Sequence, residues 1–217
     1  AQVTKLASAE GEAGVRGVAA SVEIGKRRNQ HGCRMGGHVP AIRHQPDLAA
    51  IWEPKILANA YDPRNIPSAQ KHAVTIGMGM TEKQGGSDVL SNTTRAEKSA
   101  EGFYHLIGHK WFFSVPQSDA HLVLAQAPAG LSCFFVPRLL PDGQRNGVHL
   151  ERLKDKLGNR ANASSEVEFF NACGWLVGEE GDGVRQILKM GGLTRFDCAL
   201  GSHALMRRAY SVALYHA

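Results

Sequence analysis

The chain has 217 residues, of which 43% are hydrophobic and 21% charged, with a formal net charge of +5. These values are typical of an ordinary globular protein of one or two domains with a sizeable core. No stretch approaches the ~18 apolar residues of a membrane span, and no charged-then-apolar secretory leader opens the sequence. We therefore expect a cytoplasmic protein with no membrane partner.

The cysteines and histidines do not predict a disulfide scaffold or a metal site. Cys33, Cys133, Cys173 and Cys198 are widely spaced, without a C-x-x-C pair, so we expect free thiols. His105 and His109 are four residues apart in a strand-like run, which separates them by ~13 Å, too far to share an ion. Cys33 between two histidines is the remaining candidate, but its surroundings show no ordered pattern. We expect no metal.

Two basic clusters contribute to the positive charge, Lys26–Arg28 and Arg152–Lys156. Such clusters can attract the phosphates of nucleic acid or of coenzyme A. The alternative, which we favour, is that they are solvated faces.

The first 39 residues differ from the rest of the chain. They are poor in large apolar side chains and show no sustained helical or strand period. We expect this segment to be either disordered, because it buries too little apolar surface, or a shifted reading frame. Residues 47–57 then predict short helices, and the chain ends at Ala217 within an apparent helix. We expect a fragment.

Strand patterns dominate between His72 and Gly178. The predicted strands are 73–80, 91–98, 103–114, 120–126, 131–137, 147–153 and 164–170, separated by Gly-containing turns. Seven short strands at this spacing predict a barrel or a pair of packed sheets. From Asp182 onward the apolar residues follow a helical period.

The segment from Met78 to Asp88 is the most informative one. Its glycines allow a backbone to approach a ligand closely, and the hydroxyls of Thr81 and Ser87 can donate hydrogen bonds to it. It is not a dinucleotide fingerprint, because Glu82 occupies the place of the third glycine. The alternative is a polar turn between strands.

The second informative segment is the end of the predicted strand 103–114. Strand alternation places Phe112 and Ser114 on one face, and Trp111 and Phe113 on the other. We expect Phe112 to share a ligand-binding face with Ser114, and Trp111 and Phe113 to lie in the core. The alternative is that all these aromatics are ordinary strand residues.

Both segments resemble signatures of the acyl-CoA dehydrogenase flavoproteins. The first resembles T-E-x-x-x-G-S-D, matched by Thr81, Glu82, Gly86, Ser87 and Asp88. The second resembles a G-x-K run that ends in two bulky residues and a hydroxyl, matched by Gly108, Lys110, Phe112, Phe113 and Ser114. Residues 178–195 resemble the family's entry into its C-terminal helical domain. Residues 76–217 are most similar to the alkylation-response branch, often named isovaleryl-CoA dehydrogenases.

The resemblance implies an α+β fold, in which a central β-barrel or sandwich is flanked by helical segments and the C-terminal helical domain is truncated. Residues 40–71 would be the remnant of an N-terminal helical domain, 72–180 the β-domain and 181–217 the start of the C-terminal domain. The implied cofactor is FAD, and the intact protein would be a homotetramer. The implied FAD contacts are Met78, Gly79, Met80, Thr81, Gly86, Ser87, Phe112, Phe113 and Ser114.

The family reaction removes two hydrogens from an acyl-CoA: a carboxylate takes the α-proton and the flavin accepts the hydride. In most members the catalytic glutamate would lie beyond the end of this chain. In isovaleryl-specific members it precedes a helix arginine, and here that position is Thr194 before Arg195. Glu82 is expected to brace its loop. We therefore expect no catalytic residue and an inactive fragment; the alternative function is an FAD-containing DNA-binding protein of the alkylation-damage response, acting through a later domain.

Overall fold

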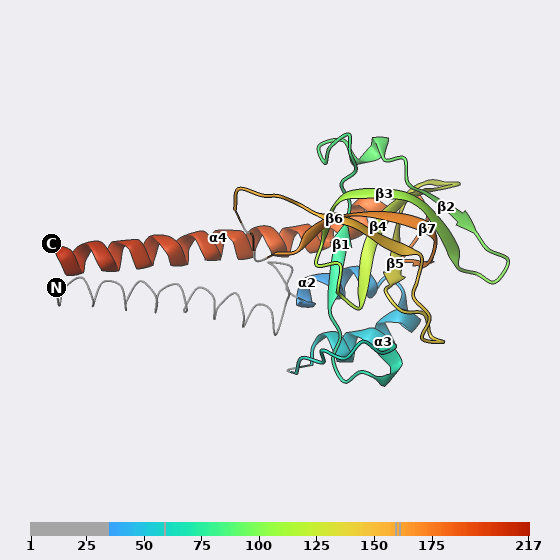
Figure 1. The fold of residues 1–217 in the computed structure, drawn as a ribbon, viewed down its shortest axis with the longest axis horizontal. Helices are drawn as coiled ribbons and strands as arrows, with labels where there is room; N and C mark the ends of the chain where they lie inside the picture. Colours follow the sequence, from blue (N-terminus) through green and yellow to red (C-terminus); the bar gives the residue numbers. More distant parts are fainter. Residues whose placement is uncertain (1–34, 59, 159, 161) are drawn as a thin grey trace.

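The structure is a computed structural model that describes residues 35–58, 60–158, 160 and 162–217. Three helices and seven strands make up this part of the chain (Figure 1). The helices are α2 (Met35–Ile42), α3 (Pro46–Ile56) and α4 (Gly183–His216), with short 3-10 turns at Ser68–Gln70 and Val89–Ser91. The strands are β1 (Ile76–Gly79), β2 (Arg95–Lys98), β3 (Tyr104–Ser114), β4 (Ala120–Ala127), β5 (Gly130–Pro137), β6 (Val148–Leu153) and β7 (Ser164–Leu176).

The seven strands form one sheet in the order β1-β3-β2-β4-β5-β7-β6. Additional pairings of β1 with β4 and of β3 with β7 bend this sheet into a barrel-like domain. Each predicted strand has a counterpart, and the predicted fold class is confirmed. The prediction was wrong at the start of β2, since residues 89–91 form a 3-10 turn, and at the end of β7, which continues to Leu176.

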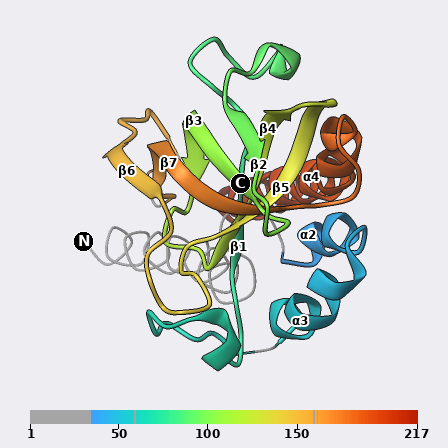
Figure 2. The same cartoon turned by 90° about the vertical axis from the view of Figure 1, so that its right-hand side faces the viewer.

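The core has two parts, one on each face of the strands. The first lies inside the barrel, where Phe113, Phe134 and Phe169 are among the buried side chains. The second lies between β4, β5 and the helices, where Trp52 of α3 packs edge-on against Phe135 of β5 at 4.6 Å. Figure 2 shows α2, α3 and the base of α4 on this side of the barrel. Because β4 is covered on both faces, its first six residues are all buried.

The helix predicted from Asp182 onward is α4, which is 34 residues long. Ile187 near its start is buried in the core, and its later turns extend away from the barrel (Figure 1). These turns expose large apolar side chains: Phe196, Leu200, Leu205, Met206, Tyr210, Val212, Leu214 and Tyr215. In the described part of the chain, no helix is both long and apolar enough to cross a membrane.

The predicted division into segments stays a prediction. The boundary placed at residue 39 falls inside α2, and residues 1–34 lie outside the described part. The expected disorder or frame shift applies mostly to those residues. The candidate metal ligand Cys33 is one of them. Among the described residues, Cys133, Cys173 and Cys198 are free cysteines.

Candidate cofactor-binding face

The loop that follows β1 lies against the end of β3. Gly79 of β1 pairs with Phe113 of β3, and the backbone N–H of Trp111 donates to the Thr81 carbonyl at 2.8 Å. A Cβ on Gly79 would come within 2.6 Å of the Phe113 ring, so only glycine allows this close approach. The two segments that the sequence analysis singled out are therefore direct neighbours.

Two glycines shape the loop itself. Gly85 has φ +114°, and its N–H donates to the Glu82 carbonyl at 3.0 Å, which closes a tight turn. A Cβ on Gly86 would lie 2.8 Å from the Thr81 hydroxyl oxygen, so this hydroxyl lies directly beside the Gly86 backbone. Ser87 is exposed. The segment is a polar turn, as the alternative interpretation held, and it also places Thr81 next to β3.

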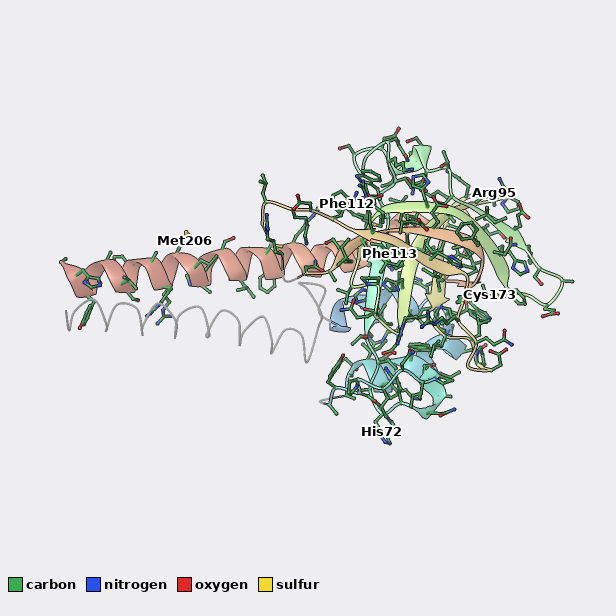
Figure 3. All side chains as sticks on the ribbon, viewed as in Figure 1. His72, Arg95, Phe112, Phe113, Cys173 and Met206 are labelled. Atoms are coloured by element: carbon green, nitrogen blue, oxygen red, sulfur yellow. The ribbon has the colours of Figure 1, made fainter. Side chains whose placement is uncertain are left out.

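Phe112 and Phe113, at the end of β3, lie in different environments (Figure 3). The Phe112 side chain is 45% exposed, and Ser114 is partly buried. Phe113 is fully buried and stacks on the His121 ring, with 3.9 Å between the centroids. A ligand on the outer face could therefore contact the Phe112 ring, beside the Lys154 ammonium that lies 4.8 Å from the ring centroid, but could not contact Phe113, which is 0% exposed.

The prediction that Trp111 lies in the core is wrong. Trp111 is only partly buried, and the Lys154 ammonium lies 3.1 Å from its ring centroid, in a cation–π contact. The cause is a shift in the β3–β7 register between Lys110 and Phe113, because such an irregularity interrupts the regular alternation of faces. Lys154 also pairs with Glu166 at 2.6 Å, so it is held in place from both sides.

His121 fixes the backbone at the end of β3. Its Nε2 lies 3.3 Å from the Ser114 carbonyl and 3.1 Å from that of Val115; because carbonyls only accept, Nε2 carries the proton and donates. Burial lowers the pKa of His121 to about 3, so the ring is neutral. Val115 has φ +53°, which is unusual for a branched residue. His121 therefore helps to hold the turn that follows Ser114.

A buried ion pair joins the loop to β3. The Lys110 ammonium lies 2.6 Å from the Glu82 carboxylate, and both side chains are 0% exposed. Glu82 also accepts hydrogen bonds from the backbone N–H of Thr93 at 2.7 Å, from the Thr93 hydroxyl at 2.9 Å and from the N–H of Thr94 at 3.1 Å. Sequence analysis expected Glu82 to brace the loop, and these contacts place it in that role.

The protonation of Glu82 follows from these contacts. Burial alone would raise the pKa of the carboxyl, but the Lys110 charge and the hydrogen bonds of Lys110, Thr94 and Thr93 outweigh burial and lower the pKa to about 2. Burial lowers the pKa of Lys110 to about 8, against the opposing effect of Glu82. The pair is therefore ionised at neutral pH.

The lowered pKa of Glu82 predicts a loss of stability in acid. Its contribution is fully present above the ordinary glutamate pKa of about 4.5 and is lost as the pH falls through about 2. The difference between these two pKa values corresponds to roughly 3 kcal/mol of unfolding free energy, since one pKa unit is about 1.4 kcal/mol. Urea unfolding at pH 7 and pH 3 should show a smaller pH-dependent loss for Glu82→Gln than for the unsubstituted protein. An equal loss in both would contradict this assignment.

The predicted FAD-contact residues differ in how far they are exposed. Met78, Met80, Thr81 and Ser114 are partly buried, Gly86, Ser87 and Phe112 are exposed, and Gly79 and Phe113 are buried. A flat ring with a polar chain attached could contact the exposed aromatic surface, the hydroxyl groups and the glycine backbone of this face. In the described part of the chain, no group of three His, Cys, Asp or Glu residues could hold a metal ion. His121 and Lys154 were missed by sequence reasoning.

A groove of about 590 Å³ lies between the 3-10 turn after this loop and the start of α4. Leu90, Leu131, Val184 and Leu188 give it apolar walls, and Lys189 and Arg185 lie among its lining residues. Arg185 pairs with Asp182 at 2.7 Å. The groove therefore combines apolar surface with basic groups.

Comparison with known proteins identifies relatives of this arrangement. Residues 77–172, from β1 into β7, match the acyl-CoA dehydrogenase middle domain. AidB of Escherichia coli (strain K12) is 72% identical over 166 residues, which cover 76% of this chain and 31% of AidB. Its similarity agrees with the branch predicted from the sequence. The chain spans about a third of the length of the curated relatives that it matches.

Two solved structures extend the comparison. The crystal structure of Caenorhabditis elegans ACDH-11 in complex with C11-CoA has a TM-score of 0.69 at 30% identity, covering 82% of this chain and 32% of ACDH-11. The Bacillus anthracis acyl-CoA dehydrogenase complexed with FAD has a TM-score of 0.50 at 25% identity, covering 56% of this chain and 21% of that one.

Proposed function

Because this chain belongs to the acyl-CoA dehydrogenase family, we propose that the loop from Met78 to Ser87 and the end of β3 form part of an FAD site. The protein would dehydrogenate a short branched acyl-CoA. The observation that carries the proposal is that the loop and the end of β3 are joined, since the Trp111 N–H donates to the Thr81 carbonyl at 2.8 Å, next in sequence to Phe112, which is 45% exposed. These residues fit a flavin, since a flat ring can cover Phe112 while its polar edge meets hydroxyl groups.

Each residue has a defined role in this proposal. The Phe112 ring covers one face of the flavin, and the Ser114 hydroxyl donates a hydrogen bond at its edge. Thr81 and Ser87 donate to polar oxygens of the cofactor, Gly86 lets the backbone approach it, and Gly79 leaves room for the Phe113 ring beneath this face. FAD, when bound, supplies the hydride acceptor for the reaction. His121 keeps the Ser114 backbone in place through its Nε2–H donor.

The substrate proposal rests on the groove beside α4. Its apolar walls of Leu90, Val184 and Leu188 fit an acyl chain. Lys189 in the lining fits an anionic coenzyme, whereas Asp182, also in the lining, pairs with Arg185 and reduces its free charge. A neighbour of the same fold, ACDH-11, was solved with C11-CoA. The acyl group therefore enters between the loop and α4.

In this proposal Glu82 is not the base that takes the α-proton. Glu82 is fully buried and engaged by Lys110 and two threonines, so it cannot reach a substrate. We propose that the base and the remaining FAD contacts come from the parts of the family proteins that this chain does not span. The intact protein is a homotetramer in this proposal.

A chimera tests the proposal. In it, the residues of this chain that align with AidB replace those of AidB, and the purified protein is titrated with FAD by flavin fluorescence. We expect the chimera to bind FAD and the 217-residue chain to bind it at least a hundredfold more weakly, because losing several kcal/mol of contacts costs about tenfold per 1.4 kcal/mol. Submicromolar binding by the chain alone, or no FAD in the chimera, would contradict the proposal.

The alternative proposal is an FAD-containing DNA-binding protein of the alkylation-damage response. The net charge of +5 and the basic residues Arg152, Lys154 and Lys156 favour it. Glu166 pairs with Arg152 and Lys154, however, which reduces their free charge. DNA binding by the chimera that weakens steeply with salt, without dehydrogenation, would support this alternative.

A further inference from the structure

The ion pair of Glu82 and Lys110 lies between the two segments of the proposed FAD site. Glu82 is the next residue after Thr81, and Lys110 precedes Phe112 by two residues. The pair is buried and joined at 2.6 Å, so each side chain holds the other's backbone segment at a fixed distance. The pair thereby connects the hydroxyl-bearing loop with the aromatic strand end.

The hydrogen bonds around the pair extend this connection to a third segment. Glu82 holds the backbone of Thr93 and Thr94, while the Thr94 hydroxyl donates to the His109 carbonyl at 2.9 Å. The Lys110 ammonium also lies 3.3 Å from the Thr94 hydroxyl. Hydrogen bonds to an ionised carboxylate are about twice as strong as neutral ones. The loop, residues 93–94 and β3 are therefore fixed by one charged group.

Two further contacts are aligned by this network. The Trp111 N–H donates to the Thr81 carbonyl at 2.8 Å, and the Lys83 N–H donates to His109 Nε2 at 3.2 Å. Both contacts cross from the loop to β3, one on each side of Glu82. If Glu82 moved, both contacts would lose their alignment.

A second buried pair provides a comparison. Lys71 and Asp119 are also joined at 2.6 Å, with side chains 3% and 7% exposed. Asp119 accepts hydrogen bonds from the N–H and hydroxyl of Thr75, at the segment before β1. This pair connects chain segments that contain none of the predicted FAD contacts. It therefore separates a general effect on stability from an effect on the FAD site.

We infer that Glu82 and Lys110 are positioning residues, which set the loop against the end of β3 before any cofactor binds. The importance of this positioning for FAD binding rests on the proposed function. The positioning of the loop against β3 is a property of the chain alone. Because the carboxylate has its acceptor positions filled by the protein, it is not available to a ligand. Its effect on FAD is exerted through the positions of Thr81 and Phe112.

Hydrogen exchange of the 217-residue chain without FAD tests the inference. The protection of the Trp111 amide is compared with that of amides in the β4–β5 ladder, which report on the whole domain. In Glu82→Gln, the ratio of Trp111 protection to β4–β5 protection should fall about tenfold or more, because the Trp111–Thr81 hydrogen bond opens locally. Lys71→Met should lower both and leave the ratio within about twofold. Thr93→Val, which removes one hydrogen bond to Glu82, should give an intermediate fall and is expected to remain folded.

The outcomes distinguish the inference from the proposed function. An unchanged ratio in Glu82→Gln and Thr93→Val would show that the pair is merely structural and would overturn the inference. If Glu82→Gln does not fold, Thr93→Val alone decides, and an unchanged ratio overturns the inference. In a parallel FAD titration of the chimera, we expect Glu82→Gln to bind about tenfold more weakly than the unsubstituted chimera, and Lys71→Met to bind equally. If the unsubstituted chain and the chimera both bind no FAD, the proposed function fails. The hydrogen-exchange ratio then still tests whether Glu82 and Lys110 position the loop against β3.

Discussion

Replacement of Lys110 by alanine is expected to lower the free energy of unfolding by about 3–5 kcal/mol. The substitution leaves the fully buried Glu82 carboxylate without its cation, and removing one partner of such a pair leaves an uncompensated charge. Urea denaturation followed by circular dichroism measures the change. The exposed Lys98→Ala is a matched control and should change stability by less than about 0.5 kcal/mol.

A double substitution makes this result specific. Glu82→Gln combined with Lys110→Met removes both charges, so it should cost less than Lys110→Ala alone. If Lys110→Ala costs under about 1 kcal/mol, the pair does not hold the loop in the way proposed. If the double variant is less stable than the single one, the cost lies in packing and not in the unpaired charge.

The 217-residue chain is expected to show no measurable dehydrogenation of isovaleryl-CoA, even with added FAD. In the proposed site Glu82 is buried against Lys110 and is not available to take the α-proton, and general-base catalysis typically contributes ~10²–10⁴-fold. Weak retention of FAD lowers turnover further. A dye-reduction assay, with a full-length homologue as the positive control, measures the difference. Turnover within about tenfold of the homologue, lost in Glu82→Gln, would contradict this account and identify Glu82 as the base.

The strands were predictable because local patterns determine them. The β4 segment is mostly apolar, interrupted by His121 and Gln126, since helices cover one face and the barrel interior the other. Phe112 is exposed and Phe113 is buried, as the alternation of strand residues predicted, although the register shift changes the environment of Trp111 beside them. The start of β2 was missed because a 3-10 turn occupies residues 89–91, and turns of this kind leave little trace in a strand pattern.

The remaining errors and omissions arise from contacts between distant segments. Trp111 lies outside the core because the β3–β7 register shifts beside it, which no single strand reveals. His121 supports Ser114 from a different strand, and its only signal was a histidine within an apolar run. The partner of Glu82 is 28 residues away. Sequence alone could indicate that Glu82 braces the loop, but could not name Lys110 as its partner.

The hydroxyl groups of the loop and of β3 are proposed to bind FAD. The most direct measurement is the FAD affinity of the chimera carrying Thr81→Ala, Ser87→Ala and Ser114→Ala together. The control chimera carries Ser68→Ala, Ser99→Ala and Ser202→Ala, which lie outside the proposed face. With each lost hydrogen bond worth about 1 kcal/mol, we expect the first to bind FAD on the order of a hundredfold more weakly and the control to bind it unchanged. Equal FAD affinity of the two chimeras would contradict the assignment of this face.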